Sequence, residues 1–274
     1  MHNRQPQADR LPDRSTGPVI TSIHHDQAKY VRSLVRRQVR QREGRFVVEG
    51  TRLAEEVVRA GVRPALVFYT EAWSDSPAGR RLLPMLRPAD QGDWLVSEAV
   101  LATCSDTETP QGVLAVVPFV SIAPRPGLIL ILDQIRDPGN MGTILRSAEA
   151  SGTGQVILAP GTVDLYNPKV VRGAMGAHFR LPVASLDWPA IARLIEGKAV
   201  WLADAAGETA CDRVDWTVPS ALIVGGEAAG AGEQAKALAT GRVSIPMAGG
   251  AESFNAAMAA TVIVFEAARQ SRAQ

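Results

Sequence analysis

The sequence contains no apolar run long enough to cross a membrane as a helix. Its longest apolar stretch, residues 256–265, is well short of the roughly 20 residues that a bilayer span requires. The first 18 residues are polar and lack the apolar core of a secretory signal peptide. We therefore expect a cytoplasmic protein with no membrane partner and with a flexible tail over residues 1–20.

Cysteine is also scarce, which excludes a disulfide-rich scaffold. The two cysteines, Cys104 and Cys211, lie far apart and have no His or Cys neighbours at the spacing of metal ligands. The sequence therefore predicts two free thiols and no metal site. We interpret His24, His25 and His178 as structural residues.

An excess of charge of one sign is absent as well. The chain has 29 Lys and Arg residues against 28 Asp and Glu residues, and 46% of its residues are hydrophobic. These values are typical of an ordinary globular protein that is neither disordered nor embedded in a membrane. Because 274 residues exceed the usual size of one domain, we expect two domains.

The small net charge conceals one strongly basic segment. Residues 29–45 include seven basic residues and one acidic residue, a density suited to binding phosphate backbones. Apolar residues recur through the segment at helical spacing, which predicts an amphipathic helix with the basic groups on its outer face. A solvated helix face is the alternative. The candidate RNA-binding residues are Lys29, Arg32, Arg36, Arg37 and Arg40, together with Arg136 in a later loop.

Strands and helices alternate over the first half of the chain, which is typical of an α/β domain. Strands are predicted at residues 46–48, 65–69, 93–96 and 113–117, and helices at 50–60, 77–86 and 97–102. Residues 121–127, with two prolines and a glycine, form the best candidate linker. We therefore predict a smaller domain at residues 21–120 and a larger one at 128–274.

The second half is more regular and predicts an open parallel sheet. Residues 128–132 are a continuous apolar run of the kind buried on both faces of such a sheet. Further strands are predicted at 156–159, 179–183, 200–203 and 221–225, with helices at 143–150, 168–175, 189–196 and 233–239. Open sheets bind ligands at the carboxyl ends of their strands. Three loops lie at that edge: residues 133–142, 225–232 and 246–252.

The last strand-to-helix passage, residues 243–269, has the features of a ligand pocket. A short strand leads into a loop of small residues, and a long apolar helix follows. Ser253 is the predicted N-cap, because its side-chain oxygen can accept from a free amide of the first helical turn. Gly249 and Gly250 would let a ligand approach the backbone, and Ser253 and Asn255 add polar groups at the mouth. A tight turn before a core helix is the alternative.

These loops carry three motifs that resemble those of the SpoU (TrmH) family of RNA ribose 2'-O-methyltransferases, within the SPOUT class. Residues 132–152 (LDQIRDPGNMGTILRSAEASG) are similar to the first motif, in which a strand ends in D-P-x-N-x-G and an arginine follows on the helix. Residues 222–230 (LIVGGEAAG) resemble the second motif, and residues 245–255 (IPMAGGAESFN) resemble the third. Three ordered motifs are far more specific than one glycine-rich loop.

The resemblance covers about residues 23–270. In the N-terminal half, FVVEGTRLAEEVVRAG and TETPQGVLAVV resemble the substrate-binding domain that accompanies this catalytic domain. The resemblance therefore implies a ribosomal-protein-like RNA-binding domain at residues 21–120 and a methyltransferase domain at 128–274. Two positions depart from the motifs: Ala228 stands in place of a glycine, and Phe254 in place of a leucine.

The resemblance further implies the architecture and cofactor of the catalytic domain. Its C-terminal segment would be threaded into a trefoil knot, S-adenosylmethionine would bind at the knot, and both protomers of a homodimer would contribute to each site. No metal is needed. The cofactor-binding residues would be Gly225, Gly226, Ile245, Met247 and Phe254, largely through backbone atoms.

Arg146 matches the arginine to which the family's catalysis is attributed. The implied reaction is in-line displacement of the cofactor's methyl group by a ribose 2'-hydroxyl, so the protein must align the reacting atoms and remove one proton. Arg146 is then either the base or a clamp on phosphate, and both roles stay open. The supporting hydrogen-bond network would consist of Asn140, Glu227, Ser253 and Asn255.

The motifs favour a ribosomal RNA 2'-O-methyltransferase over three alternatives. A dinucleotide-dependent enzyme needs G-x-G-x-x-G after its first strand, but that loop holds Asp137, Pro138 and Asn140. A non-catalytic RNA-binding protein on the same fold is disfavoured by the presence of the complete motif set. A transfer RNA methyltransferase is disfavoured by the domain order and by the N-terminal likeness.

Overall fold

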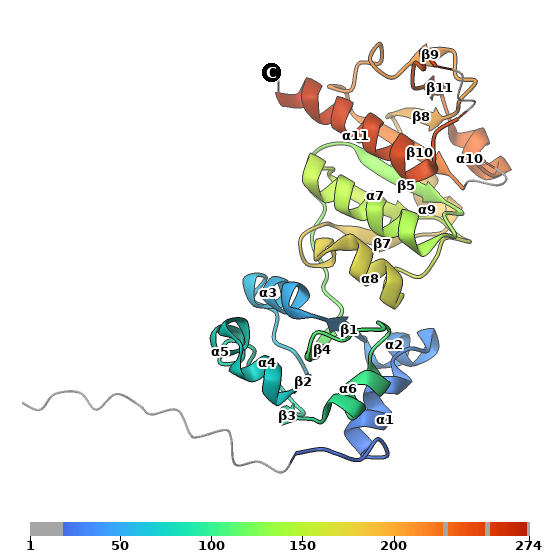
Figure 1. The fold of residues 1–274 in the computed structure, drawn as a ribbon. Helices are drawn as coiled ribbons and strands as arrows, with labels where there is room; N and C mark the ends of the chain where they lie inside the picture. Colours follow the sequence, from blue (N-terminus) through green and yellow to red (C-terminus); the bar gives the residue numbers. More distant parts are fainter. Residues whose placement is uncertain (1–18, 227–229, 250–252, 273–274) are drawn as a thin grey trace, which may run out of the picture.

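The chain folds into two α/β units, each built around its own β-sheet (Figure 1). The computed structural model describes residues 19–226, 230–249 and 253–272. The architecture confirms the predicted class, a parallel-sheet domain preceded by a smaller α/β domain. The boundaries 21–120, 121–127 and 128–274 stay a prediction, and most of the predicted tail lies outside the described residues.

The N-terminal sheet has four strands in the order β1-β4-β2-β3. Strand β4 pairs antiparallel with β1 and β2, and β3 pairs parallel with β2. Apolar side chains of α3, α4 and α5 pack on one face, and those of α1, α2 and α6 pack on the other. The elements are α1 (Asp26–Ser33), α2 (Arg37–Glu43), β1 (Arg45–Glu49), α3 (Thr51–Arg59), β2 (Leu66–Tyr69), α4 (Glu71–Asp75), α5 (Pro77–Leu82), β3 (Asp93–Leu95), α6 (Glu98–Cys104) and β4 (Val113–Pro118).

The C-terminal sheet has seven strands in the order β7-β6-β5-β10-β8-β11-β9, and all its pairs are parallel. Helices α7, α8 and α11 cover one face, and α9 and α10 cover the other. The elements are β5 (Ile129–Asp133), α7 (Pro138–Ser151), β6 (Gln155–Leu158), α8 (Pro168–Ala174), η2 (Ala177–Phe179), β7 (Val183–Ser185), α9 (Trp188–Leu194), β8 (Ala199–Ala203), β9 (Thr209–Ala210), β10 (Ser220–Gly225), α10 (Glu233–Leu238), β11 (Gly241–Ser244) and α11 (Ala256–Arg272). None of the helices within the described ranges could span a membrane.

The structure corrects three of the predicted elements. The basic segment forms two short helices, α1 and α2, and Val35 in the turn between them is 59% exposed. Helix α7 starts at Pro138 rather than near residue 143, because Asp137 caps it by accepting a 2.7 Å hydrogen bond from the Asn140 amide. Residues 179–183 are not a strand, because the chain turns through η2 before β7 begins at Val183.

Both cysteines are free, as predicted, and both are buried. Burial raises the pKa of the Cys104 and Cys211 thiols above their usual value. Neither thiol therefore has the lowered pKa of a reactive cysteine. Their burial is consistent with a role as small apolar residues in the two cores.

His178 is buried at the junction of the two units, 5.7 Å from the ring of Phe46 and 5.8 Å from that of Tyr166. Its Nε2 lies 2.8 Å from the Leu165 carbonyl oxygen, which can only accept, so Nε2 carries the proton. Among the described residues Nδ1 has no hydrogen-bond partner. Burial therefore lowers the pKa of His178 below its usual value of 6.5.

We predict that the protein loses stability as the pH falls below about 6.5, because the unfolded chain then binds a proton that buried His178 resists. The loss continues down to the lowered folded-state pKa, with a slope of at most about 1.4 kcal/mol per pH unit. His178→Gln keeps a donor for Leu165 but does not titrate, so it should flatten this slope. Urea unfolding between pH 7.5 and 5 measures the effect. Exposed His24→Gln is the control, and an unchanged slope in His178→Gln would contradict the assignment.

Candidate active site

A cavity of about 550 Å³ lies at the carboxyl ends of β8, β10 and β11. This is the edge at which open parallel sheets bind ligands, and the volume is within the range of small-molecule pockets. The side chains of the first turns of α11 form an apolar wall. The cavity is lined by every residue predicted to bind the cofactor and by two residues of the third motif: Gly225, Gly226, Ile245, Met247 and Phe254, with Ser253 and Asn255.

Two polar residues of the cavity wall were missed by the sequence analysis. Asp204 follows β8, and its Oδ1 accepts a 2.9 Å hydrogen bond from the Ala206 amide. Lys236 belongs to α10, and its ammonium group lies 2.9 Å from Glu233. The carboxyl-end rule applied to the strand at 200–203 could have identified Asp204. No signal in the sequence places Lys236 at the cavity.

Glycine is required where the second-motif loop leaves β10. A Cβ atom at Gly225 would lie 2.4 Å from the backbone nitrogen of Ala231, and one at Gly226 would lie 2.5 Å from the carbonyl oxygen of Gln134. Either side chain would displace backbone rather than a flexible group. The two glycines therefore let three segments of chain meet at the cavity without leaving space for a side chain.

The first-motif loop is hydrogen-bonded to the second-motif loop beside the cavity. Asp133, at the end of β5, is buried, and its Oδ2 accepts a 2.7 Å hydrogen bond from the Gly232 amide. The next residue, Gln134, has a φ of 56°, a left-handed conformation that is uncommon for a residue with a side chain. Its Oε1 accepts a 3.1 Å hydrogen bond from exposed Arg136. The loops of motifs one and two are thus joined by a buried carboxylate.

The third motif is joined to the first by its asparagine. Asn255 Nδ2 donates to Asn140 Oδ1 over 3.1 Å, although 115 positions separate them in the sequence. Asn255 Oδ1 accepts from the amides of Ala257 at 2.9 Å and Met258 at 3.3 Å, so Asn255 caps α11. The prediction that Ser253 is the cap is therefore wrong, since the helix starts at Ala256, three residues beyond it.

Arg146 lies on α7 but outside the cavity of its own chain. The side chain is exposed and has no ion-pair partner among residues 19–226, 230–249 and 253–272. The neighbouring Ser147 contacts α11, where its Oγ lies 2.8 Å from Oγ1 of Thr261. Arg146 is therefore a solvent-facing cation beside the α7–α11 contact. Glu227, the remaining member of the predicted network, lies outside the described residues.

The candidate RNA-binding residues divide into exposed cations and one buried arginine. Arg40 is only 3% exposed, donates to the carbonyls of Leu34 and Val35, and forms an ion pair with Asp164. It therefore cannot present its charge to RNA, and its prediction as an RNA contact is corrected. The other candidates keep their charge accessible at least in part: Lys29, Arg32, Arg36, Arg37 and Arg136.

Comparison with known proteins agrees with this geometry. Residues 127–265 match the model of the SpoU rRNA Methylase family, and residues 25–115 match the MRM3-like substrate binding domain. The mouse mitochondrial rRNA methyltransferase 3 is 31% identical over 86% of this chain and 70% of its own length. The 23S rRNA (guanosine(2553)-2'-O)-methyltransferase RlmP of Bacillus subtilis is 30% identical over 90% of this chain and 97% of its own. The SpoU methyltransferase AviRb of Streptomyces viridochromogenes, solved with AdoMet, is 31% identical, with a TM-score of 0.79 over 89% of this chain and 97% of its own.

We predict that Asn255→Ala destabilises the protein by about 1 kcal/mol, because α11 loses its N-cap and the bond to Asn140 is broken. Thermal unfolding followed by circular dichroism measures this as a lower midpoint. Ser253→Ala is the matched control, since Ser253 lies two residues earlier and outside the first turn of α11. Equal midpoints for the two variants would contradict Asn255 as the cap.

Proposed function

Because the chain belongs to the SpoU rRNA methylase family, we propose that it methylates a ribose 2'-hydroxyl of ribosomal RNA with S-adenosylmethionine as the methyl donor. The observation that carries the proposal is that all three sequence motifs meet at one cavity edge. A substrate-binding domain at residues 25–115 favours ribosomal over transfer RNA.

The residues of the cavity fit this cofactor. Its apolar wall on α11 suits the faces of an adenine ring, and the strand-end backbone offers donors and acceptors to the ring edge. Asp204 offers a carboxylate to the polar groups of such a ligand. When bound, the cofactor supplies a methyl group on a positively charged sulfur. The residues that would hold the cofactor are Gly225, Gly226, Ile245, Met247 and Phe254, and the hydrogen-bonded pair Asn140–Asn255 adjoins them.

We predict that Gly225→Ala weakens S-adenosylmethionine binding at least tenfold, since the new methyl group would displace the backbone of residues 230–231. Gly197→Ala is the matched control, because Gly197 does not line the cavity and a Cβ there meets nothing within 4 Å among the described residues. Isothermal titration calorimetry measures both. Equal affinities for the two variants would remove Gly225 from the binding site.

The chain's own residues must deprotonate and aim the ribose hydroxyl. Arg146 is the cation that the first motif supplies for this step, either as the base or by binding the neighbouring phosphate. Its exposed position on α7 does not line the cavity of its own chain. This supports an arrangement in which Arg146 completes the site of a second copy.

A homodimer through the catalytic domain is part of the proposal. Helix α11 carries three exposed apolar side chains at helical spacing, Met258 (56%), Val262 (40%) and Phe265 (40%), and Phe254 (46%) precedes them. A row of exposed apolar side chains on one helix is typical of a subunit interface. The row adjoins Arg146, because Thr261 contacts the residue after it. Docking at this face would bring Arg146 toward the partner subunit.

We predict that Arg146→Ala abolishes methyl transfer while S-adenosylmethionine still binds. Gly225→Ala is also expected to be inactive, and mixing the two inactive variants tests the shared site. A heterodimer would combine an intact cavity from one chain with an intact Arg146 from the other. Random exchange would then restore roughly a quarter of the wild-type activity. Methylation assays with tritiated cofactor measure this. A mixture that stays inactive would place Arg146 in its own chain's site.

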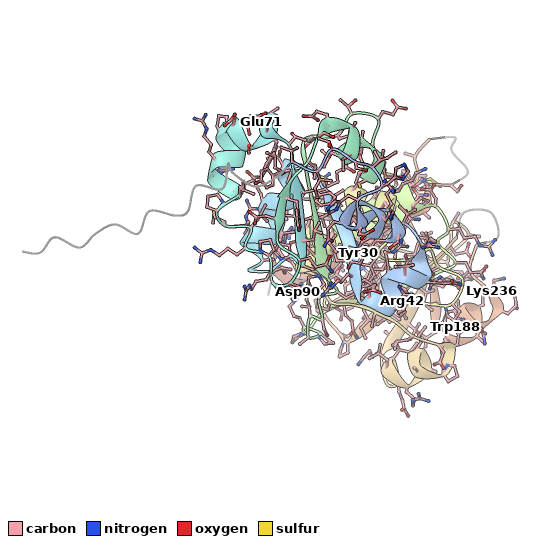
Figure 2. All side chains as sticks on the ribbon, turned by 90° about the horizontal axis from the view of Figure 1, so that it is seen from below. Tyr30, Arg42, Glu71, Asp90, Trp188 and Lys236 are labelled. Atoms are coloured by element: carbon pink, nitrogen blue, oxygen red, sulfur yellow. The ribbon has the colours of Figure 1, made fainter. Side chains whose placement is uncertain are left out.

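The RNA-binding surface is proposed to lie on the helices α1 and α2. Arg36 and Arg37 are exposed, and the Arg42 side chain is 73% exposed. Figure 2 shows Arg42 on the same side of the molecule as Lys236 of the cavity wall, whereas Glu71 of α4 is on the opposite side.

A threaded C-terminal segment is proposed as well. Strand β11 lies between β8 and β9, which both precede it in the sequence. The chain after α10 must therefore enter between strands that are already joined by the segment 204–208, and it then continues to α11 on the other face. This order supports the trefoil knot. The cytoplasmic location stays a prediction, since the mouse relative is named as mitochondrial.

A further inference from the structure

One of the hydrophobic core clusters includes residues of both units. Val171 and Phe179 of the C-terminal unit are 3% and 7% exposed and belong to the core cluster of the N-terminal sheet. The rings of Phe119 and Tyr166 stack across the junction, with centroids 3.7 Å apart and planes 5° apart. Helix α8 lies directly against β1 (Figure 1). Domains that share an apolar core of this kind do not move freely relative to each other.

A buried carboxylate sits at the edge of this core. Glu56 belongs to α3 of the N-terminal unit and is 6% exposed. One oxygen accepts from Arg59 in the same helix at 2.6 Å, and the other accepts from Arg180 of the C-terminal unit. Gly176 has a φ of 89°, and a Cβ there would lie 2.7 Å from Glu56 Cγ. The C-terminal unit is therefore shaped to fit this glutamate.

Arg180 continues the connection into the catalytic helix. Its Nε donates to Oε1 of Glu149 over 2.9 Å, while its Nη1 binds Glu56. Glu149 lies on α7, three residues after Arg146. One guanidinium thus joins α3 of the substrate-binding unit to the helix that carries the predicted catalytic arginine. A guanidinium bound by two carboxylates has a fixed orientation, because its donors lie in one rigid plane.

Three further ion pairs cross the same junction. Buried Arg40 of α2 pairs with one oxygen of Asp164, whose other oxygen lies 3.8 Å from Arg37, and Arg172 of α8 donates to Asp106 over 2.8 Å. The pairs link different elements of each unit. Together they fix the direction of the contact as well as its position, which an apolar core alone does not do.

We propose that Arg180 is a positioning residue, which locks the substrate-binding unit to α7 so that bound RNA meets the site of Arg146 in a single orientation. The inference rests on the proposed function. Its physical consequence is specific. Loss of the lock leaves the RNA contacts and the cofactor cavity intact, but it lets the ribose sample orientations that do not react. Alignment of reacting atoms is lost, so kcat falls while KM for RNA is retained.

The test compares Arg180→Gln with Arg81→Gln as the matched control. Arg81 pairs with Glu55, the residue next to Glu56 on α3, but this ion pair is exposed and lies within the N-terminal unit. Arg180→Gln should lower kcat about tenfold, with KM for RNA and cofactor affinity changed less than twofold. Arg81→Gln should change none of these. The stoichiometry of cofactor binding, measured by calorimetry, gives the fraction of correctly folded protein, and kcat is calculated for that fraction. Arg180→Lys keeps the positive charge but not the rigid planar donors, so it should recover only part of the loss.

A further variant distinguishes a positioning role of Arg180 from a direct role in RNA binding. The double variant Arg36→Gln/Arg42→Gln alters the proposed RNA surface without touching the junction, so it should raise KM for RNA and leave kcat nearly unchanged. The same pattern in Arg180→Gln would overturn the proposal, because Arg180 would then be an RNA contact. Wild-type kinetics in Arg180→Gln would overturn it too.

Distance measurements decide the question independently of activity. Spin labels can be attached to Ala72→Cys and Glu196→Cys, two exposed positions of which one lies in each unit. Double electron–electron resonance then measures the distance between the two units. The native cysteines are buried and should stay unlabelled. With labelled chains diluted in an excess of unlabelled protein, so that distances between protomers are not detected, the otherwise wild-type chain should give one narrow distance distribution and Arg180→Gln a broader one. A broad distribution with native Arg180 would refute the positioning role of Arg180 even if the protein methylates RNA. A narrow distribution that broadens in Arg180→Gln would support that role even if no methylation of RNA were detected.

Discussion

The close packing of α7 against α8 and α11 is the constraint on which the rest of the structure depends. A Cβ atom at Gly142 of α7 would lie 2.8 Å from the Cα of Gly173 in α8, so the two helix backbones touch. On its other side α7 meets α11 through Ser147 and Thr261. Because α7 cannot shift between them, its start presents Asn140 to the third motif, and its end presents Glu149 to Arg180, which contacts Glu56 of the N-terminal unit. One helix therefore connects the cofactor loops, the predicted catalytic arginine and the domain junction.

The sequence predicts the site better than it predicts the junction, and the reason is physical. The motif residues follow strand ends, and the carboxyl ends of parallel strands meet at one edge whatever lies between them. The three loops could be placed together on that basis, and the family resemblance then selected Gly225, Ile245 and Phe254, which line one cavity. The burial of Arg40 could not be predicted in this way. It depends on an ion pair with Asp164, which lies 124 positions away and belongs to no recognisable sequence motif. The cap was missed for a smaller reason. Ser253 and Asn255 are both good N-caps, and only the start of α11 decides between them.

The two edges of the C-terminal sheet differ in electrostatics as well as in shape. A second cavity, of about 680 Å³, lies at the amino ends of β5 and β10, near the last turns of α7 and α11. Helix C-termini carry partial negative charge, and the three cations of that cavity, Arg125, Lys198 and Arg272, offset it. At the carboxyl edge lie the helix N-termini of α7 and α11, whose first-turn amides are bonded to the side-chain oxygens of Asp137 and Asn255. The two edges of the sheet thus present opposite helix ends.

The polar contacts of the junction are best explained by specificity rather than by stability. Burying Glu56 and Arg40 costs desolvation energy that an apolar pair of similar size would avoid. The shared core around Phe119 and Tyr166 already holds the units together without directional bonds. Stacked rings tolerate sliding and rotation, whereas a guanidinium held between two carboxylates does not. An enzyme that recognises RNA with one domain and reacts with it at another needs that orientation fixed, because small misalignments at the reacting atoms are costly. We therefore attribute the ion pairs to alignment and the aromatic core to association.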